Sequence, residues 1–400
     1  MPKILHINVT ANWGSTGRIT EQLCTLARTK GWECFVAYGR YANRSNFNLL
    51  KVGGKLNVYE HYIENRLLDN EGLASRLATK RFVRKIKRIA PDIIHLHNIH
   101  DHWINYRILF EYLNTTDIPL VWTQHDCWAF TGGCAHFAIN SCMKWQTDCQ
   151  QCQYKRSLYD RSSRNLSLKK KLFLAHKNLT IVPVSHWLED EIGKSFLKNN
   201  KIQTIYNGVD INIFNHKDSG FIRKKYGLID KFVLLGVASA WSDKKGFKDY
   251  ITLSQLLPQD CVIVMVGLPI KQIESLPLNI IGIERTNNVE ELVEFYSMAD
   301  VVLNLSYQES FGLTTVEGMA CGTPSIVYNA TASPELVSQE TGIIVQAGDI
   351  DGVLAAIYQM KSVGKDFYSI SCRARVEEHF QDDKCFDKYI KLYNDILLDE

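Results

Sequence analysis

Short runs of apolar and β-branched residues alternate along the chain with longer segments whose apolar positions follow helical spacing. The short runs predict strands, which we expect at residues 3–9, 34–39, 92–98, 120–126, 179–185, 201–207, 232–239, 261–267, 279–284, 301–306, 324–329 and 341–346. Most of these runs are apolar throughout, which is typical of parallel strands covered on both faces. Segments 16–31 and 288–300 are examples of the helices expected between them.

The alternation of strand and helix occurs twice, which predicts an α/β fold of two doubly wound, Rossmann-like domains. A seam is expected at 206–214, where turn residues follow a strand. We therefore assign 1–205 to an N-terminal domain and 206–375 to a C-terminal domain. The last helix, within 376–400, is expected to pack back on the N-terminal domain. We expect the two domains to face each other across a cleft at the carboxyl ends of their strands.

Composition limits the choice of partners. A chain of 400 residues with 46% hydrophobic content can form substantial cores in two or three domains. The 46 basic residues nearly balance the 43 acidic ones, so the net charge of +3 gives no indication of a nucleic-acid partner. Two basic runs, at 76–88 and 155–171, indicate either solvated helix faces or contact with an anionic membrane surface.

The sequence predicts a cytoplasmic protein with at most peripheral contact at the inner face of the membrane. Met1 leads directly into a strand-like run, without the pattern of a signal peptide. The longest apolar stretches, 232–241 and 261–268, are shorter than the roughly 18 residues needed to span a bilayer. The 11 cysteines of such a chain indicate reduced thiols or metal ligation rather than disulfides.

Two acidic residues, Glu309 and Glu317, follow the apolar run 301–306 in a segment that otherwise reads as buried. A helix is expected over about 312–321, because Gly322 suits the position just beyond a helix C-terminus. Glu309 would then lie on the loop before the helix, and Glu317 within it, about 7–8 Å along the axis at 1.5 Å per residue.

The start of this helix favours a phosphate group, because the N–H groups at Gly312, Leu313 and Thr314 would be unpaired. A phosphate there, with one acid on each side, matches the dimensions of a nucleotide diphosphate sugar. The alternative is that Glu309 caps the helix and Glu317 is a surface residue.

Segment 309–326, "ESFGLTTVEGMACGTPSI", resembles the signature of the retaining glycosyltransferases of family 4, which have the GT-B fold. The pattern is an acid, seven residues, a second acid, then Gly, Ala and Gly-x-Pro. Other segments match in the expected order: "GSTGR", "PDIIHLHN", "TQHD", "VPVSHWLED", "IYNGVDINIF", "KKGFKDY" and "MADVVLNLS". The resemblance covers essentially the whole chain. "HDCWAFTGGC" is similar to a colanic-acid-type bacterial subgroup that builds exopolysaccharide or O-antigen units.

The resemblance implies transfer of a sugar from a nucleotide diphosphate sugar, with retention at the anomeric carbon and without a catalytic metal or other cofactor. Glu309 would contact the donor sugar and support an oxocarbenium-like transition state, and Glu317 would hold the ribose. Lys245 would neutralise the diphosphate as a point charge. The backbone amides of Gly312 and Leu313 would assist it.

One position departs from the family pattern. Many members have an arginine five residues before the lysine, and this chain has Ala240 there. A second cationic contact is expected from Lys244 or Arg18, or is absent. Gly14, Gly17 and Arg18 match the family's glycine-rich loop near the diphosphate and acceptor, although an ordinary strand-to-helix turn explains that loop equally well.

His125, at the end of a predicted strand, matches the family histidine near the donor sugar, and Asp126 follows it. The run 95–102 holds four histidines, of which His95 and His97 would share one face of a strand. The resemblance makes this run a cleft-lining segment, which we favour over a metal site.

Asp349 and Asp351 form the single Asp-x-Asp of the chain. This pair is similar to the metal-binding acids of the other large glycosyltransferase fold. Because an apolar helical segment follows, we expect helix capping instead.

Four cysteines, Cys134, Cys142, Cys149 and Cys152, crowd an insertion at about 127–155. The last two have the Cys-x-x-Cys spacing that suits tetrahedral zinc, and a structural zinc would order this polar loop. Free thiols or disulfides are the alternatives.

The leading hypothesis is a glycosyltransferase acting on a saccharide acceptor, in particular a lipid-linked polysaccharide intermediate. A second hypothesis is other chemistry on a nucleotide sugar, as in a soluble disaccharide synthase or an epimerase. A third is a sugar-binding homologue without catalysis, which the absence of arginine at position 240 would suit.

Overall fold

The computed structural model describes residues 1–153 and 157–398 and divides the chain into two compact units. Unit 1 comprises Met1–Tyr206 together with the chain from Phe386 onward, and unit 2 comprises Asn207–Cys385. The two positions Lys155 and Arg156, which belong to the second predicted basic run, lie outside the described residues.

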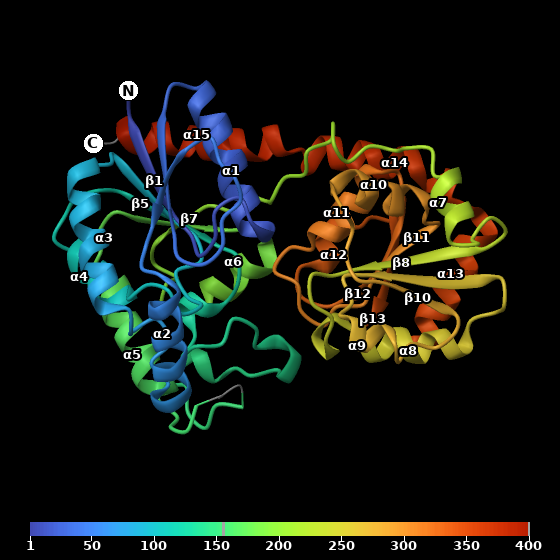
Figure 1. The fold of residues 1–400 in the computed structure, drawn as a ribbon, viewed down its shortest axis with the longest axis horizontal. Helices are drawn as coiled ribbons and strands as arrows, with labels where there is room; N and C mark the ends of the chain where they lie inside the picture. The colour runs from blue at the N-terminus through green and yellow to red at the C-terminus, as the bar shows by residue number, and fades with distance from the viewer. Residues whose placement is uncertain (154–156, 399–400) are drawn as a thin grey trace. The chain divides into compact units, whose positions relative to one another are not determined.

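Unit 1 is built on a seven-stranded parallel sheet with the order β3-β2-β1-β4-β5-β6-β7 (Figure 1). The strands are β1 (Lys3–Ile7), β2 (Glu33–Tyr38), β3 (Asn48–Lys51), β4 (Ile93–Leu96), β5 (Leu120–Gln124), β6 (Leu179–Pro183) and β7 (Lys201–Ile202). The direction of the chain across the sheet reverses between β1 and β4, as in a doubly wound fold. Strands β4, β5 and β6 are buried along their whole length, which explains their continuous apolar sequences.

Helices cover both faces of this sheet (Figure 1). They are α1 (Gly14–Thr29), α2 (Lys55–Leu68), α3 (Arg76–Ile89), α4 (Tyr106–Leu113), α5 (Ser162–Phe173), α6 (His186–Gly193) and α15 (Asp382–Leu398). On one face, Phe110 of α4 and Phe173 of α5 stack with ring centroids 4.5 Å apart, and Trp122 of β5 packs on Phe173. On the other face, Tyr393 of α15 lies within hydrogen-bond distance, 2.7 Å, of His95.

Unit 2 is a six-stranded parallel sheet with the order β10-β9-β8-β11-β12-β13. Its strands are β8 (Phe232–Val237), β9 (Cys261–Val266), β10 (Ile280–Ile283), β11 (Val301–Asn304), β12 (Ser325–Asn329) and β13 (Gly342–Gln346). Its helices are α7 (Gly220–Lys225), α8 (Phe247–Leu256), α9 (Ile270–Ile273), α10 (Val289–Met298), α11 (Leu313–Ala320), α12 (Ser333–Leu336), α13 (Ile350–Val363) and α14 (Lys365–His379). Both units therefore have the predicted doubly wound α/β architecture.

Every predicted strand is present, and the differences lie at weak elements. Strand β3 was not predicted, because it is a four-residue strand at the sheet edge with partly exposed side chains. The run 201–207 forms only the two-residue strand β7. The chain returns to unit 1 at Phe386 rather than at residue 376, since α14 packs against α11 inside unit 2.

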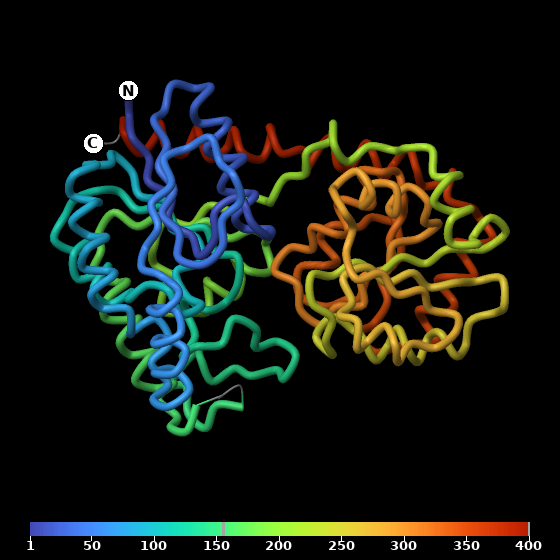
Figure 2. Tube along the Cα trace, viewed as in Figure 1, coloured from blue at the N-terminus to red at the C-terminus, as the bar shows by residue number. Residues whose placement is uncertain are grey.

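The insertion after β5 has little regular structure. Beyond Trp128–Phe130, residues 131–153 contain only two short 3-10 turns and follow an irregular path (Figure 2). Within residues 1–153 and 157–398, no helix combines the length and the apolar character that a membrane crossing requires.

Candidate active site

Lys245 and Glu309 form an ion pair in unit 2. The Lys245 Nζ donates to Glu309 Oε1 at 2.6 Å, and the carboxylate side chain is only 13% exposed. Lys245 ends a 3-10 turn after β8, and Glu309 lies on the loop after the neighbouring strand β11. The Tyr307 N–H joins these two loops by donating to the Lys244 carbonyl oxygen at 2.9 Å. The two predicted catalytic residues of unit 2 are therefore in direct contact.

The backbone of Glu309 is fixed by the loop after β12. Its N–H donates to Thr331 Oγ1 at 2.8 Å, and the same hydroxyl donates to the Glu309 carbonyl oxygen at 2.9 Å. Thr331 itself has a positive φ of 49°, which is uncommon for a β-branched residue. The interpretation of Glu309 as a helix cap is wrong, because no side chain caps α11 and the carboxylate pairs with Lys245.

Helix α11 begins one residue later than predicted, with Gly312 as its N-cap. Gly312 has φ 109°, and a Cβ atom there would lie 2.9 Å from Leu336 Cδ1, so this position requires glycine. At the other end, the Gly322 N–H bonds to Met319 and the Thr323 N–H to Gly318, which is the Schellman pattern. The start of the helix, at Leu313, follows the loop of Glu309 directly in the chain.

Glu317 lies on α11 and is half-buried. The hydroxyl of Tyr296, a buried residue of α10, donates to Glu317 Oε2 at 2.6 Å. Burial and the nearby carboxylate together raise the pKa of Tyr296. The interpretation of Glu317 as a plain surface residue is therefore wrong, whereas contact with a ribose stays a prediction.

In unit 1, His125 is the first of three histidines joined in a row. His125 Nε2 lies 3.1 Å from His97 Nδ1, and His97 Nε2 lies 3.1 Å from His6 Nδ1. Burial lowers the pKa of His125 to about 4 and that of His6 to about 3, so both rings are neutral at pH 7. The outer nitrogen of His6, Nε2, is buried and has no partner among residues 1–153 and 157–398. An unpaired acceptor is easier to bury than an unpaired donor, so His6 Nε2 is expected to carry no proton. His6 Nδ1–H then donates to His97 Nε2, and His97 Nδ1–H donates to His125 Nε2.

His6, His95 and His97 also have nitrogen atoms within 4.8 Å of one another, which is close enough to consider a metal. However, the rings of His95 and His97 are stacked, with centroids 4.1 Å apart and planes 25° apart. Lone pairs in nearly parallel ring planes do not converge on one ion. In addition, both nitrogens of His95 are engaged, by Tyr393 and by Thr123. These histidines are buried in unit 1, and the absence of a metal there stays a prediction.

Asp126 fixes the loop that carries His125. Its carboxylate accepts from the Trp128 N–H at 2.8 Å and pairs with His100 Nε2 at 2.8 Å. The pKa of His100 rises to about 9: burial alone would lower it, but the charge and hydrogen bond of Asp126 outweigh burial. The sequence predicted no more than a loop position for His100. Its partner Asp126 is 26 positions away, so no local pattern could identify the pair.

Gly14–Arg18, predicted as a glycine-rich loop, form the first turn of helix α1. A Cβ atom at Gly17 would lie 2.7 Å from Thr10 Oγ1, so the turn needs glycine at this close approach. Gly14 and Arg18 are exposed. These contacts explain the glycine as a turn residue, and a phosphate contact of the loop stays a prediction. Asp349, in contrast, caps α13 by accepting from the Gly352 N–H at 2.8 Å, which confirms the predicted role.

The four cysteines of the insertion share one neighbourhood as free thiols. Burial raises the pKa of Cys134 to about 12, with further contributions from Cys152 and Cys149. Burial raises the pKa of Cys149 to about 11, and Cys152 and Cys142 contribute as well. Among the described residues, the sulfur atoms do not form a group of three within 4.8 Å, so a zinc ion would have to draw them together.

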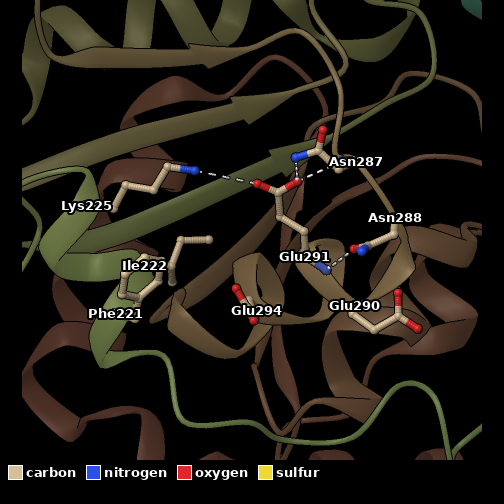
Figure 3. Close-up of a pocket in the computed structure, with 8 residues that line it drawn as sticks. All are labelled: Phe221, Ile222, Lys225, Asn287, Asn288, Glu290, Glu291 and Glu294. Atoms are coloured by element: carbon tan, nitrogen blue, oxygen red, sulfur yellow. Dashed lines mark hydrogen bonds and ion pairs between the residues drawn. The ribbon is translucent and has the colours of Figure 1, made fainter.

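A separate cavity in unit 2 lies between α7 and α10 (Figure 3). Its wall includes Glu291, whose carboxylate accepts from the backbone and side chain of Asn287 and lies 3.7 Å from Lys225 (Figure 3). Glu290 and Glu294 also line it, and three acidic residues make it unsuitable for a diphosphate. It contains none of the predicted site residues.

Two family models match the chain: "Glycosyltransferase Family 4" over residues 16–213 and "Glycosyl transferases group 1" over residues 218–367. Among curated relatives, N-acetyl-alpha-D-glucosaminyl L-malate synthase of Bacillus anthracis is 28% identical over 233 residues, 55% of this chain and 60% of the relative. O-antigen chain mannosyltransferase B of Escherichia coli is 36% identical over 70 residues, 18% of each chain. The chain thus spans less than two thirds of the length of these relatives.

Solved structures resemble the whole chain. Sucrose-phosphate synthase from Thermosynechococcus elongatus has a TM-score of 0.74 at 16% identity, and the match covers 100% of both chains. Anabaena HepE in complex with UDP-glucose has a TM-score of 0.68 at 15% identity, with 98% of this chain and 99% of that chain covered. At these identities the similarity establishes a shared fold.

Proposed function

The chain belongs to glycosyltransferase family 4 and has the GT-B fold, and on this premise we propose that it is a retaining glycosyltransferase using a nucleotide diphosphate sugar. The observation that carries the proposal is the Lys245–Glu309 ion pair beside the start of α11. A cation, a carboxylate and a helix N-terminus at one sheet edge supply what a diphosphate leaving group and a positively charged sugar transition state need.

In the proposed mechanism, the diphosphate of the donor takes over Lys245 as its counterion. The N–H groups at Leu313 and the next residue donate to the diphosphate oxygens and stabilise their negative charge, which grows as the sugar–phosphate bond breaks. Glu309, released from the lysine, then faces the sugar and stabilises the developing positive charge on the ring. The acceptor hydroxyl forms the new bond to the anomeric carbon on the face that the diphosphate leaves, and its proton passes to the leaving phosphate oxygen. Catalysis proceeds without a metal, because Lys245 and the helix perform the neutralisation. Glu317 is assigned to the ribose, Lys244 or Arg18 to a second phosphate contact, and neutral His125 to the donor sugar.

We propose a saccharide acceptor, in particular a lipid-linked polysaccharide intermediate at the inner membrane face. The relative named O-antigen chain mannosyltransferase B supports this choice. A soluble small acceptor is the second candidate, and the relative named as a glucosaminyl malate synthase favours it. The well-ordered pairing of Lys245 with Glu309 argues against a homologue that only binds sugars.

The proposal is tested by screening nucleotide diphosphate sugars for thermal stabilisation of the protein and assaying those that bind for transfer. We expect one donor, at about 100 times its Kd, to stabilise the fold by about 2.7 kcal/mol. NMR of the product should show the anomeric configuration of the donor, and activity should survive EDTA. A product of inverted configuration would refute the retaining mechanism, and recovery of activity only with Mn²⁺ would refute the absence of a metal.

We also propose that Cys134, Cys142, Cys149 and Cys152 bind one structural zinc ion. The support is their shared neighbourhood in an insertion of 3-10 turns, where Cys134 and Cys149 each lie near Cys152. Elemental analysis of protein purified without added metal should find about one zinc per chain. Cys142→Ser should lose the metal, whereas Cys261→Ser, in strand β9, should keep it. A zinc content near zero in the wild type would reject the site.

A further inference from the structure

Helix α2 is packed with its polar side inward. Only His61 is buried among its 14 residues. This histidine lies 3.0 Å from Ser75 Oγ and accepts from the Gly72 N–H at 2.8 Å. Asn65 Nδ2 lies 2.9 Å from His102 Nε2. Ordinary surface helices bury an apolar stripe against the core, so the inner face of α2 is the reverse of the usual arrangement.

The outer face of α2 carries a stripe of apolar residues next to the exposed charged residues Lys55, Glu60 and Arg66. Its exposed apolar side chains are Leu56 (85% exposed), Tyr59 (65%), Tyr62 (48%), Ile63 (41%) and Leu67 (46%). Four of them, at positions 56, 59, 63 and 67, have the spacing of a single helix face. The stripe continues beyond the end of the helix, because the Leu158 N–H donates to the Arg66 carbonyl oxygen and Leu158 and Tyr159 are 71% and 59% exposed. We call these seven residues the apolar stripe.

Helix α3, next to α2, is strongly basic. No acidic residue lies between Arg76 and Ile89. The exposed residues of the helix are Arg76, Leu77, Lys80, Arg81, Arg84, Lys85, Lys87 and Arg88. The two helices touch, because Arg76 donates to both carboxylate oxygens of Glu64. The start of α3 therefore lies beside α2, and the other exposed cations follow along α3.

We propose that the apolar stripe and the basic face of α3 together dock unit 1 on an anionic lipid bilayer. Tyrosine, leucine and isoleucine on a convex helix face can enter the boundary between headgroups and acyl chains, while neighbouring lysines and arginines bind the anionic headgroups. A nucleic acid would use the cations but would leave the stripe exposed. A protein partner, or a second copy of the chain, would need acidic groups opposite α3. This surface would bring the enzyme to a lipid-linked acceptor, and only this purpose rests on the proposed function.

The test is co-sedimentation of the full chain with vesicles of phosphatidylcholine and phosphatidylglycerol at 3:1, compared with phosphatidylcholine alone. We expect binding to the mixed vesicles and at least about tenfold weaker binding without phosphatidylglycerol. The triple variant Leu56→Gln, Ile63→Gln and Leu67→Gln should lose about tenfold or more in partitioning, because its apolar contacts are gone. The triple variant Lys80→Gln, Arg81→Gln and Arg84→Gln should lose a similar factor and much of the salt dependence.

Matched controls are available in the same chain. Leu278, Phe367 and Ile370 of unit 2 are 68–106% exposed, and changing all three to glutamine should leave vesicle binding unchanged. Lys271, Lys388 and Lys391 are exposed lysines that serve the same purpose for charge. Thermal stabilisation by the donor should be equal in all variants, which separates failure of the docking surface from failure of the proposed function.

Three results would overturn the proposal. The first is wild-type protein that stays in the supernatant with the mixed vesicles, and the second is an α2 variant that binds them as well as the wild type. The third is light scattering that shows a dimer abolished by the α2 variant, without vesicle binding, which would assign the stripe to a second copy.

Discussion

Glu309→Gln is expected to lower kcat by about 10³-fold or more, while the protein stays folded. The carboxylate pairs with Lys245, and its negative charge would stabilise the positive charge that develops on the donor sugar. Glutamine keeps the size of the side chain and does not disturb the bonds between the Glu309 backbone and Thr331. Steady-state kinetics with the donor found by thermal shift would measure the effect.

The affinity for the donor, unlike kcat, should not fall in Glu309→Gln. Without the carboxylate, Lys245 has no protein counterion to leave when the diphosphate arrives, so the Kd of the donor should stay equal or decrease. Glu274→Gln, at an exposed glutamate of the same unit, is the matched control and should leave both quantities unchanged. Turnover of Glu309→Gln within tenfold of the wild type would contradict the catalytic role.

The sequence was sufficient to predict this fold because its strands are buried on both faces. β4, β5, β6 and β11 contain only buried positions, and such strands have apolar runs that stand out without any other information. β3 lacks this signal, since its edge position leaves its side chains partly exposed. The return of the chain at Phe386 also could not be predicted, because α14 and α15 are both amphipathic and only tertiary packing decides which unit each one joins.

The candidate site was predictable to the level of its residues, but not to the level of their contacts. The spacing of Glu309, Glu317 and the glycine pointed to the helix start. The partners of these acids are far away in sequence: Lys245 is 64 positions from Glu309, and Tyr296 is 21 from Glu317. Likewise, the row from His125 through His97 to His6 forms only because β1, β4 and β5 are neighbours in the sheet. The register of β1 and β4 places His6 opposite His95. Such contacts follow from sheet order, and a single sequence does not specify sheet order.

Apolar patterning can also mislead. The stripe on α2 has the spacing of a helix face that packs on a core, yet the structure turns it toward solvent. The sequence signal for this reversal is the polar pair His61 and Asn65, which lies on the opposite face and makes the inward hydrogen bonds. A helix whose polar face satisfies buried backbone groups leaves its apolar face available for a partner.

Lys245→Met is expected to lower kcat/KM by about 10²- to 10³-fold, because the diphosphate loses its point charge at the moment when the leaving group gains negative charge. Lys248→Met is the matched control. It lies three residues further on, is exposed, and pairs with Asp243 at 2.7 Å rather than with the site, so its kcat/KM should stay within twofold of the wild type. Lys245→Arg should restore only part of the loss, since a planar guanidinium does not replace a compact ammonium group.

The double variant Lys245→Met, Glu309→Gln tests whether the two residues act as one unit. Without ligand, Lys245→Met leaves the Glu309 carboxylate, 13% exposed, without its cation, and the free energy of unfolding should fall by about 1 kcal/mol. Adding Glu309→Gln removes the unpaired charge and should restore most of that stability. In catalysis, the double variant should be no slower than the slower single variant, because groups that stabilise one transition state are not additive. Additive losses in both stability and kcat/KM would mean that the ion pair is a chance contact, and the proposed exchange of Lys245 from Glu309 to the diphosphate would be refuted.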